Sequence, residues 1–179
     1  CGVPVRFVSE QQAAEGGLRP FRAVIAPALT HAPDSLVTAV AEYCQAGGRL
    51  WVAGEGVPFS RDEYNHPREV SLPVQAVHTF ASGATARALW PLFLGKMRAE
   101  RIEPLAVAVG KDGQRVWGVE YRSARGKDGV LVSIANLWGT PQTVRLTANG
   151  RRPQTATDLR RMAPVRNGEL TLKPLEATI

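Results

Sequence analysis

The stretch "FRAVIAPALTHAPDSLVTAVAEYCQAGGRLWVAGEG", residues 21–56, contains the signals that decide the fold. Its first part, residues 21–29, is a short apolar run of the kind found in buried strands. Asp34, preceded by a proline, suits the first turn of a helix, and Gly47, followed by a second glycine, can end one in the left-handed conformation. Residues 49–54 form another apolar strand. A strand, a helix and a strand with short connections predict a right-handed parallel crossover, and therefore an α/β sheet.

The predicted helix has one apolar face. The residues that fall on it at helical spacing are Leu36, Val37, Val40, Tyr43 and Cys44. We interpret Cys44 as an inert core residue, because a free cysteine among apolar neighbours behaves as a small hydrophobic side chain. The chain has only two cysteines, and no CxxC motif or Cys/His cluster indicates a metal site. The sequence predicts neither a metal nor a cofactor.

Three segments flank this unit. "VPVRFVSE", residues 3–10, alternates apolar and polar residues and predicts a strand. Residues 57–73 are polar with several prolines, which indicates a long excursion from the core. Residues 83–104 predict a partly helical segment in which Pro91 breaks or kinks the helix, with the later helix beginning near it. The chain begins with Cys1 and a strand signal follows at once, so we expect a piece of a longer chain.

After Pro104 the pattern changes to strands and turns only. The strand-like stretches are "LAVAVG" (105–110), "RVWGVEYRSA" (115–124), "GVLVSIANLW" (129–138), "QTVRLTA" (142–148) and "ELTLKPLEATI" (169–179). Asp-Gly and Asn-Gly turns separate several of them, which is typical of antiparallel strands. The sequence therefore predicts two domains, an α/β domain over residues 1–103 and a small antiparallel β-sandwich over residues 104–179.

Composition narrows the classes of partner. The net charge of +6 comes mostly from scattered arginines. Nucleic-acid binding proteins concentrate such charge on one face with exposed aromatics, so we interpret it as a solvated surface and expect no nucleic-acid partner. No apolar run approaches the ~18 residues of a membrane span, and we expect no membrane contact. No signal-peptide pattern is visible, and the compartment is left open.

Polar residues follow the predicted parallel strands, at the edge where α/β proteins usually bind ligands. Glu55 stands between two glycines after one strand, and His31 follows the other. Both have a structural alternative, since the glycines can serve a tight turn and a lone histidine is usually structural. The loop "SRDEYNHPRE" adds further candidates, listed here: Asp62, Glu63, Tyr64, His66 and Arg68. They could contact a ligand or another subunit, or could form a solvated loop with weak ion pairs.

Several kinds of catalytic site lack their motifs. There is no GxSxG turn for a serine nucleophile, no glycine-rich phosphate loop, and no stretch that convincingly places two opposed carboxylates for glycoside hydrolysis.

The β-rich part holds Trp117, Tyr121 and Trp138, and aromatic side chains can form platforms for sugars. Trp117 and Tyr121 share one face of a strand with Val119, so packing in the core is the alternative.

The sequence resembles the C-terminal region of family 42 β-galactosidases, namely their glutamine-amidotransferase-like "trimerisation" domain and small C-terminal β-domain. The first part of the resemblance lies in Ile25-Ala26-Pro27 and in the helix that ends with a tyrosine and two glycines at residues 43–48. The second lies in "GVEYRSA", "VLVSIANLWGTPQTVRL" and the closing "TDLRRM" and "GELTLKPLEATI". The resemblance is weak over residues 57–104.

The resemblance implies an incomplete flavodoxin-like α/β domain followed by a β-sandwich. It also implies that the catalytic carboxylates belong to an upstream TIM barrel, which needs about 200 residues of its own. Class I amidotransferases carry a cysteine nucleophile after this strand, but Gly54 or Glu55 holds that position here, and Cys44 is about ten residues too early. Amidotransferase activity is therefore contradicted.

Three functions follow from these observations. The first is a non-catalytic module that packs against its own barrel, forms homo-oligomers and lends a loop to a neighbouring site. The second is a carbohydrate-binding module, and the third is a small-molecule site near His31 and Glu55. The parent chain is expected to be a β-galactosidase-like glycoside hydrolase.

Overall fold

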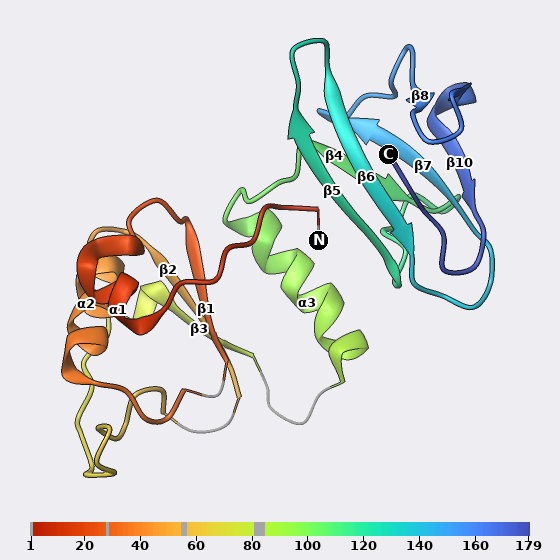
Figure 1. Cartoon of the computed structure of the whole chain (residues 1–179). Coiled ribbons are helices and arrows are strands. Elements are labelled where there is room, and N and C mark those ends of the chain that lie inside the picture. Colours follow the sequence, from red (N-terminus) through yellow and green to blue (C-terminus); the bar gives the residue numbers. More distant parts are fainter. Residues whose placement is uncertain (1, 28, 55–56, 81–84) are drawn as a thin grey trace. The chain divides into compact units, whose positions relative to one another are not determined.

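The computed structural model describes residues 2–27, 29–54, 57–80 and 85–179 (Figure 1). The chain forms two compact units, Arg6–Pro91 and Leu92–Ile179, the second joined by Cys1–Val5. We call the first the α/β unit and the second the β unit. The division falls within helix α3 (Ala86–Ala99), earlier than the boundary expected near residue 104. The domain boundaries themselves stay a prediction.

The α/β unit is built on a parallel sheet with strand order β1-β2-β3. Strand β1 (Ala23–Pro27) pairs with β2 (Arg49–Ala53), and β2 pairs with β3 (Val77–Phe80), both in parallel. Helix α2 (Asp34–Gln45) connects the first two strands. The strands, the helix and the parallel crossover predicted from residues 21–54 are therefore confirmed. Strand β3 was not predicted, because it is short and follows a long polar segment that is rich in proline.

Helix α2 ends in a Schellman turn. The N–H of Gly48 donates to the carbonyl of Tyr43 at 2.9 Å, and the N–H of Gly47 donates to that of Cys44 at 3.1 Å. Gly47 has φ 96°, a conformation that glycine adopts without a steric penalty. At Gly48 a Cβ atom would lie 2.3 Å from the Tyr43 ring. The two glycines thus have separate roles, one in backbone conformation and one in close packing.

The tyrosine of this turn also ties the sheet together. The hydroxyl of Tyr43 donates to the carbonyl of Phe21 at 3.1 Å and accepts from the N–H of Arg49 at 3.3 Å. It therefore links the residues just before β1 to the start of β2. Tyr43 and Cys44 lie in the core, and burial raises the pKa of the Cys44 thiol. The inert core position predicted for Cys44 agrees with this burial.

The core of the α/β unit lies between α2 and one face of the sheet. Its buried residues include Ala26, Leu36, Val40, Leu50, Val52 and Phe59. The short helix α1 (Glu10–Gln12) and the π-helical turn η1 (Ala13–Gly17) add Ala13 to this core. A 3₁₀ turn, η2 (Val74–Ala76), precedes β3.

Two expectations for this part are wrong. Residues 3–9 form no strand, and Phe7 is 95% exposed. Alternation of apolar and polar residues indicates a strand only where a neighbouring strand supplies hydrogen bonds. Within the described residues, the edge strand β1 pairs with β2 alone, so residues 3–9 do not extend this sheet. Helix α3 begins at Ala86 and continues through Pro91, instead of beginning near the proline. Pro91 stands in the second turn of α3, where a proline removes one backbone hydrogen bond, and the helix continues past it.

The β unit contains two three-stranded antiparallel sheets, ordered β10-β7-β4 and β11-β6-β5. The strands are β4 (Ala106–Val109), β5 (Val119–Arg125), β6 (Val130–Asn136), β7 (Gln142–Ala148), β10 (Glu169–Leu172) and β11 (Ala177–Thr178). A short pair, β8 (Thr157–Asp158) and β9 (Ala163–Pro164), and a 3₁₀ turn, η3 (Arg166–Gly168), complete it. The antiparallel strands predicted after residue 104 are confirmed.

One core lies between these two sheets. Its buried residues come from both, namely Ala108, Val119, Tyr121, Ile134, Val144, Leu170 and Leu172. Val119 and Tyr121 therefore pack inside, in agreement with the core alternative for that strand. Trp117 is half-buried, and Trp138 is more exposed.

A buried asparagine fixes the turns at one end of the sandwich. Asn136 is fully buried, and its Nδ2 donates to the carbonyls of Thr140 at 2.8 Å and Lys173 at 2.9 Å. Its Oδ1 accepts from the N–H of Trp138 at 2.9 Å. The side chain thus holds the turn after β6 against the turn after β10, which lie side by side in Figure 1.

No helix among the described residues is long and apolar enough to cross a membrane.

A buried carboxylate joins β8 to β11. Asp158 accepts from the hydroxyl of Thr178 at 2.6 Å and from the N–H groups of Arg160 and Arg161, each at 3.0 Å. The guanidinium of Arg161 lies 3.4 Å from Asp158 and 2.6 Å from Glu176. Burial raises the pKa of Asp158, but these hydrogen bonds and the arginine outweigh it, so its pKa lies below the usual value.

Candidate functional site

The segments that follow β1 and β2 run side by side. The N–H of Phe59 donates to the carbonyl of Leu29 at 2.8 Å, and the N–H of Arg61 donates to that of Thr30 at 3.1 Å. The N–H of Ala32 donates back to the carbonyl of Arg61 at 3.1 Å. Adjacent parallel strands end at the same edge of a sheet, so residues far apart in the chain meet there. This pairing brings the predicted residue His31 to the predicted loop.

The loop of residues 60–68, which we call the contact loop, closes around Asp62. One carboxylate oxygen accepts from the N–H of Tyr64 at 2.9 Å and from the N–H of His66 at 2.7 Å. The other lies 2.9 Å from Nδ1 of His66. Burial raises the pKa of Asp62, but the bonds from His66 and Tyr64 outweigh it and leave its pKa below the usual range. The carboxylate is therefore engaged in shaping its own loop.

Asn65 joins the contact loop to the segment after β1. Nε2 of His31 lies 3.0 Å from Oδ1 of Asn65, and Nη1 of Arg61 donates to the carbonyl of Asn65 at 2.8 Å. Asn65 has φ 71°, in the left-handed region that asparagine tolerates better than most residues. The sequence predicted His31 as a site residue but not this partner, because residues 34 positions apart give no local signal.

Arg68 anchors the other end of the contact loop. Its Nη1 donates to the carbonyl of Ala32 at 2.9 Å, and its Nη2 lies 2.6 Å from Oδ1 of Asp34 at the start of α2. The side chain of Arg68 is mostly buried, whereas that of Asp34 is exposed. Arg68 therefore fixes the contact loop to the first turn of α2. It could bind a ligand only if these bonds were broken.

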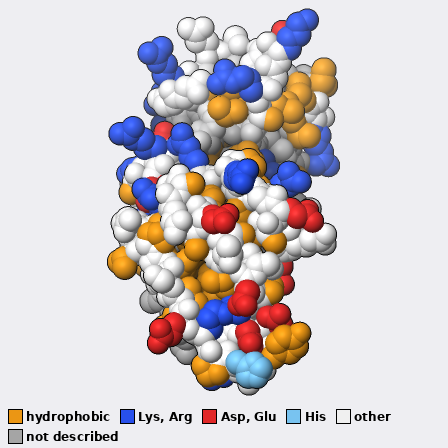
Figure 2. Space-filling view, turned by 90° about the vertical axis from the view of Figure 1, so that its left-hand side faces the viewer, with side chains coloured by type: hydrophobic (Ala, Val, Ile, Leu, Met, Phe, Trp, Pro, Cys, Tyr) orange, Lys and Arg blue, Asp and Glu red, His pale blue; other side chains and the backbone are white. Residues whose placement is uncertain are grey.

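The remaining predicted residues face the solvent. Tyr64 is 74% exposed, and its ring centroid lies 6.4 Å from that of His66. Glu63 is also exposed. Figure 2 shows exposed histidine, acidic and hydrophobic side chains gathered at one end of the surface. Glu55 lies outside the described residues.

The loop offers a polar and aromatic surface that its own hydrogen bonds hold together. Asp62, His31 and Arg68 are each hydrogen-bonded within the loop or to its neighbours, and Tyr64 and His66 project from it. Within the residues that the structure describes, no cluster of three or more His, Cys, Asp or Glu is placed to hold a metal ion. The carboxylate of Asp62 and the imidazole of His66 bond to each other.

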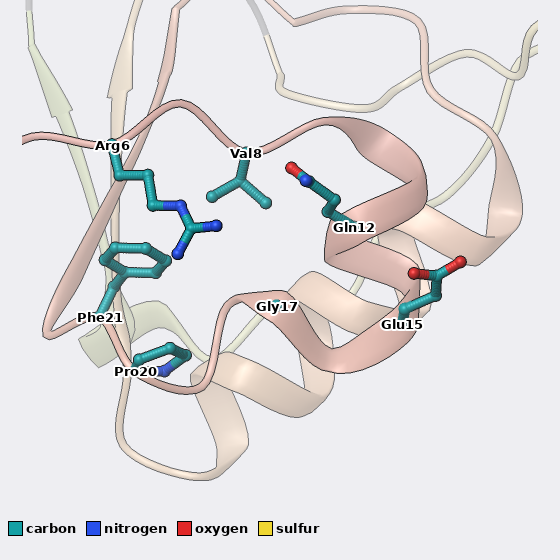
Figure 3. Close-up of a pocket in the computed structure, with 7 residues that line it drawn as sticks. All are labelled: Arg6, Val8, Gln12, Glu15, Gly17, Pro20 and Phe21. Carbon is teal, nitrogen blue, oxygen red and sulfur yellow. The ribbon is translucent and has the colours of Figure 1, made fainter.

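A cavity elsewhere in the α/β unit was not predicted from the sequence. It has a volume of about 240 Å³ and is lined by Arg6, Val8, Gln12, Glu15, Gly17, Pro20 and Phe21. Figure 3 shows the Arg6 side chain reaching toward the Phe21 ring. Ligand pockets usually measure ~300 Å³ or more. The cavity includes neither His31 nor any residue of the contact loop.

Comparisons with solved structures match nearly the whole chain. The apo exo-carrageenase GH42 from Bacteroides ovatus matches 99% of this chain with a TM-score of 0.71 and 18% identity. Gan42B, a GH42 β-galactosidase from G. stearothermophilus, matches 92% with a TM-score of 0.65 and 13% identity. The β-galactosidase from Bacillus circulans sp. alkalophilus matches 92% with a TM-score of 0.63 and 12% identity. No family model matches the chain, and no curated protein matches it.

The likeness concerns the fold and covers a fraction of each larger protein. The chain spans 24% of the carrageenase, 32% of Gan42B and 33% of the Bacillus circulans enzyme. The resemblance to a part of family 42 glycoside hydrolases is therefore confirmed at the level of fold. The mixed architecture, with a small parallel sheet and antiparallel sheets, agrees with the predicted fold class.

Proposed function

We propose that the chain is a non-catalytic C-terminal module of a glycoside-hydrolase-like protein. Its α/β unit would be an incomplete flavodoxin-like domain of the glutamine-amidotransferase-like kind, without the nucleophile. The support is the likeness of fold to about a quarter to a third of family 42 proteins, together with the lack of a cysteine at residues 54–55. The compared proteins are β-galactosidases and a carrageenase, so we infer that the parent acts on galactose-containing glycans.

The role that we propose for the module is packing against an upstream TIM barrel and formation of homo-oligomers through the contact loop. The observation that carries this proposal is the construction of the loop. Asp62, Asn65 and Arg68 hold its backbone, while Tyr64 and His66 project into solvent. A surface that is already ordered loses little conformational entropy on binding, and tyrosine is enriched at protein interfaces.

The solution mass tests this role. Light scattering over a range of concentrations is expected to show self-association of the chain, and Tyr64→Ala is expected to raise the dissociation constant at least about tenfold. The matched control is Val74→Ala, which shortens an 87% exposed apolar side chain in the same unit. A monomer at every concentration, or equal self-association of Tyr64→Ala and the unchanged chain, contradicts the proposal.

A small-molecule site at the carboxyl edge of the sheet is a weaker candidate. Residues 57–61 run along residues 29–32 there, and the backbone bonds of Phe59 and Arg61 occupy that edge. The cavity of the α/β unit lies instead around residues 6–21. Binding of sugar to the β unit would rest on other residues.

A further inference from the structure

Trp138 is held in one orientation at the end of the sandwich. Its indole N–H donates to the carbonyl of Trp117 at 2.5 Å, and its backbone N–H donates to Oδ1 of Asn136 at 2.9 Å. A Cβ atom on Gly118 would lie 2.0 Å from the indole nitrogen, so the nitrogen-bearing edge of the ring packs directly on the Gly118 backbone. The polar atom of the indole is thus directed inward.

The part of Trp138 that reaches solvent is therefore aromatic carbon. The residue is 40% exposed, and Leu175, which is 76% exposed, lies beside it. The N–H of Leu175 donates to the carbonyl of Trp138 at 3.3 Å. Leu175 has φ 55°, a conformation that costs a bulky residue ~1 kcal/mol or more and that is concentrated at functional sites. Two neighbouring turns thus hold an apolar surface open to solvent.

Two basic residues lie close to the ends of β10 and β11. Lys173 begins the turn that contains Leu175, and its charge helps to lower the pKa of the Glu176 carboxyl. Arg160 hydrogen-bonds to a backbone carbonyl of β11. The acids of this region, Asp158 and Glu176, are both paired with Arg161. The three basic residues of this region, Lys173, Arg160 and Arg161, therefore exceed its two acids by one positive charge.

The net charges of the two units differ in sign, and that of the β unit is positive. The β unit contains 15 lysines and arginines and eight aspartates and glutamates, a net charge of +7. The α/β unit contains seven basic and eight acidic residues, a net charge of −1. A surface in the β unit therefore favours an anionic ligand and disfavours a second β unit, because like charges repel.

We propose that Trp138, Leu175, Lys173 and Arg160, together called the Trp138 surface, bind an anionic polysaccharide. A pyranose ring has an apolar C–H face that matches exposed aromatic carbon, and sulfate or carboxylate groups on the sugar match lysine and arginine. The fixed indole would bind without loss of rotamer freedom. This proposal uses no residue of the contact loop, and it holds or fails independently of the oligomer role.

Tryptophan fluorescence and calorimetry test the Trp138 surface. The 179-residue chain is titrated with oligosaccharides of a sulfated galactan, of a polyuronate and of neutral agarose. We expect binding of an anionic oligosaccharide and none of agarose, and the two anionic arms distinguish sulfate from carboxylate. Trp138→Ala is expected to raise the dissociation constant at least about tenfold, and Lys173→Ala about threefold with a weaker dependence on salt.

The matched control is Lys127→Ala, which removes the same charge from the exposed turn between β5 and β6. It is expected to leave the dissociation constant unchanged. Lys173→Ala removes an exposed side chain, so it keeps the test valid if Trp138→Ala lowers the unfolding temperature. The proposal is overturned if no anionic oligosaccharide binds, if Lys127→Ala weakens binding as much as Lys173→Ala, or if RNA binds as tightly as the anionic glycan.

Discussion

The turn that ends α2 and the turns that end the β-sandwich both carry residues of the family 42 resemblance, but they are stabilised differently. At the end of α2, two glycines let the backbone turn tightly against a tyrosine ring. In the sandwich, the side chains of Asn136 and Asp158 are buried and supply hydrogen bonds that the backbone of the turns needs. The difference teaches that the two units stabilise their turns in different ways, by backbone freedom in one and by buried polar groups in the other.

The largest expected effect is at Asn136. Asn136→Ala leaves the carbonyls of Thr140 and Lys173 and the N–H of Trp138 without their partner. Since each unsatisfied buried group is costly, the free energy of unfolding is expected to fall by about 3 kcal/mol. Urea unfolding measures this loss.

Gln142→Ala is the control for Asn136, because Gln142 bonds to the hydroxyl of Thr140 at an exposed position. Its free energy of unfolding is expected to stay within about 0.5 kcal/mol of the unchanged chain. Equal stability of the two variants would contradict the role of the buried asparagine.

A smaller effect is expected at Gly48. In Gly48→Ala the new methyl group would lie 2.3 Å from the buried Tyr43 ring, so either the ring or the turn must move. We expect the free energy of unfolding to fall by about 2 kcal/mol. Gly95→Ala in α3 is the matched control, since a Cβ there meets nothing within 4 Å, and alanine should raise stability by about 0.5–1 kcal/mol. A neutral Gly48→Ala would show that the second glycine is dispensable.

The sequence predicted local structure well and long-range structure poorly. The strands and helix of residues 21–54 follow from apolar spacing and from the glycines that end α2, all within one short stretch. Residues 3–9 alternate like a strand, but alternation cannot show whether a neighbouring strand is present. The contact between His31 and Asn65 depends on two parallel segments running side by side, so each residue alone carried no signal for it.

The candidate site was predicted in part. Asp62, His66 and Arg68 were chosen as a polar cluster, and the structure places their bonds within the loop and at the start of α2. The roles of Asn136 and Asp158 were not predicted, since burial of a polar side chain depends on contacts from distant strands. The position of Pro91 inside α3 shows that a proline early in a helix is a weak boundary signal.

The smallest expected effect is the pH dependence that Asp158 gives the β unit. The fold lowers the pKa of this carboxyl, so its stabilisation is complete above the ordinary value of 3.8 and is lost as the pH falls through the lower pKa of the folded state. The pKa of Glu176 is lowered as well, by the N–H of Lys173 and the guanidinium of Arg161. Asp158→Asn is expected to show a smaller drop in unfolding temperature between neutral and acid pH.

Asp128→Asn is the control for this pH dependence, because Asp128 is exposed in the turn between β5 and β6. It should keep the pH dependence of the unchanged chain. If Asp158→Asn also keeps that dependence, the buried carboxylate is not the source of acid sensitivity.

The central proposal is that this chain is a non-catalytic module of a glycoside-hydrolase-like protein. The most direct measurement is release of the aryl group from an aryl β-galactoside by the purified 179-residue chain, compared with its Glu55→Gln variant. We expect no turnover above the buffer rate from either protein. Turnover by the unchanged chain that Glu55→Gln abolishes would contradict the claim.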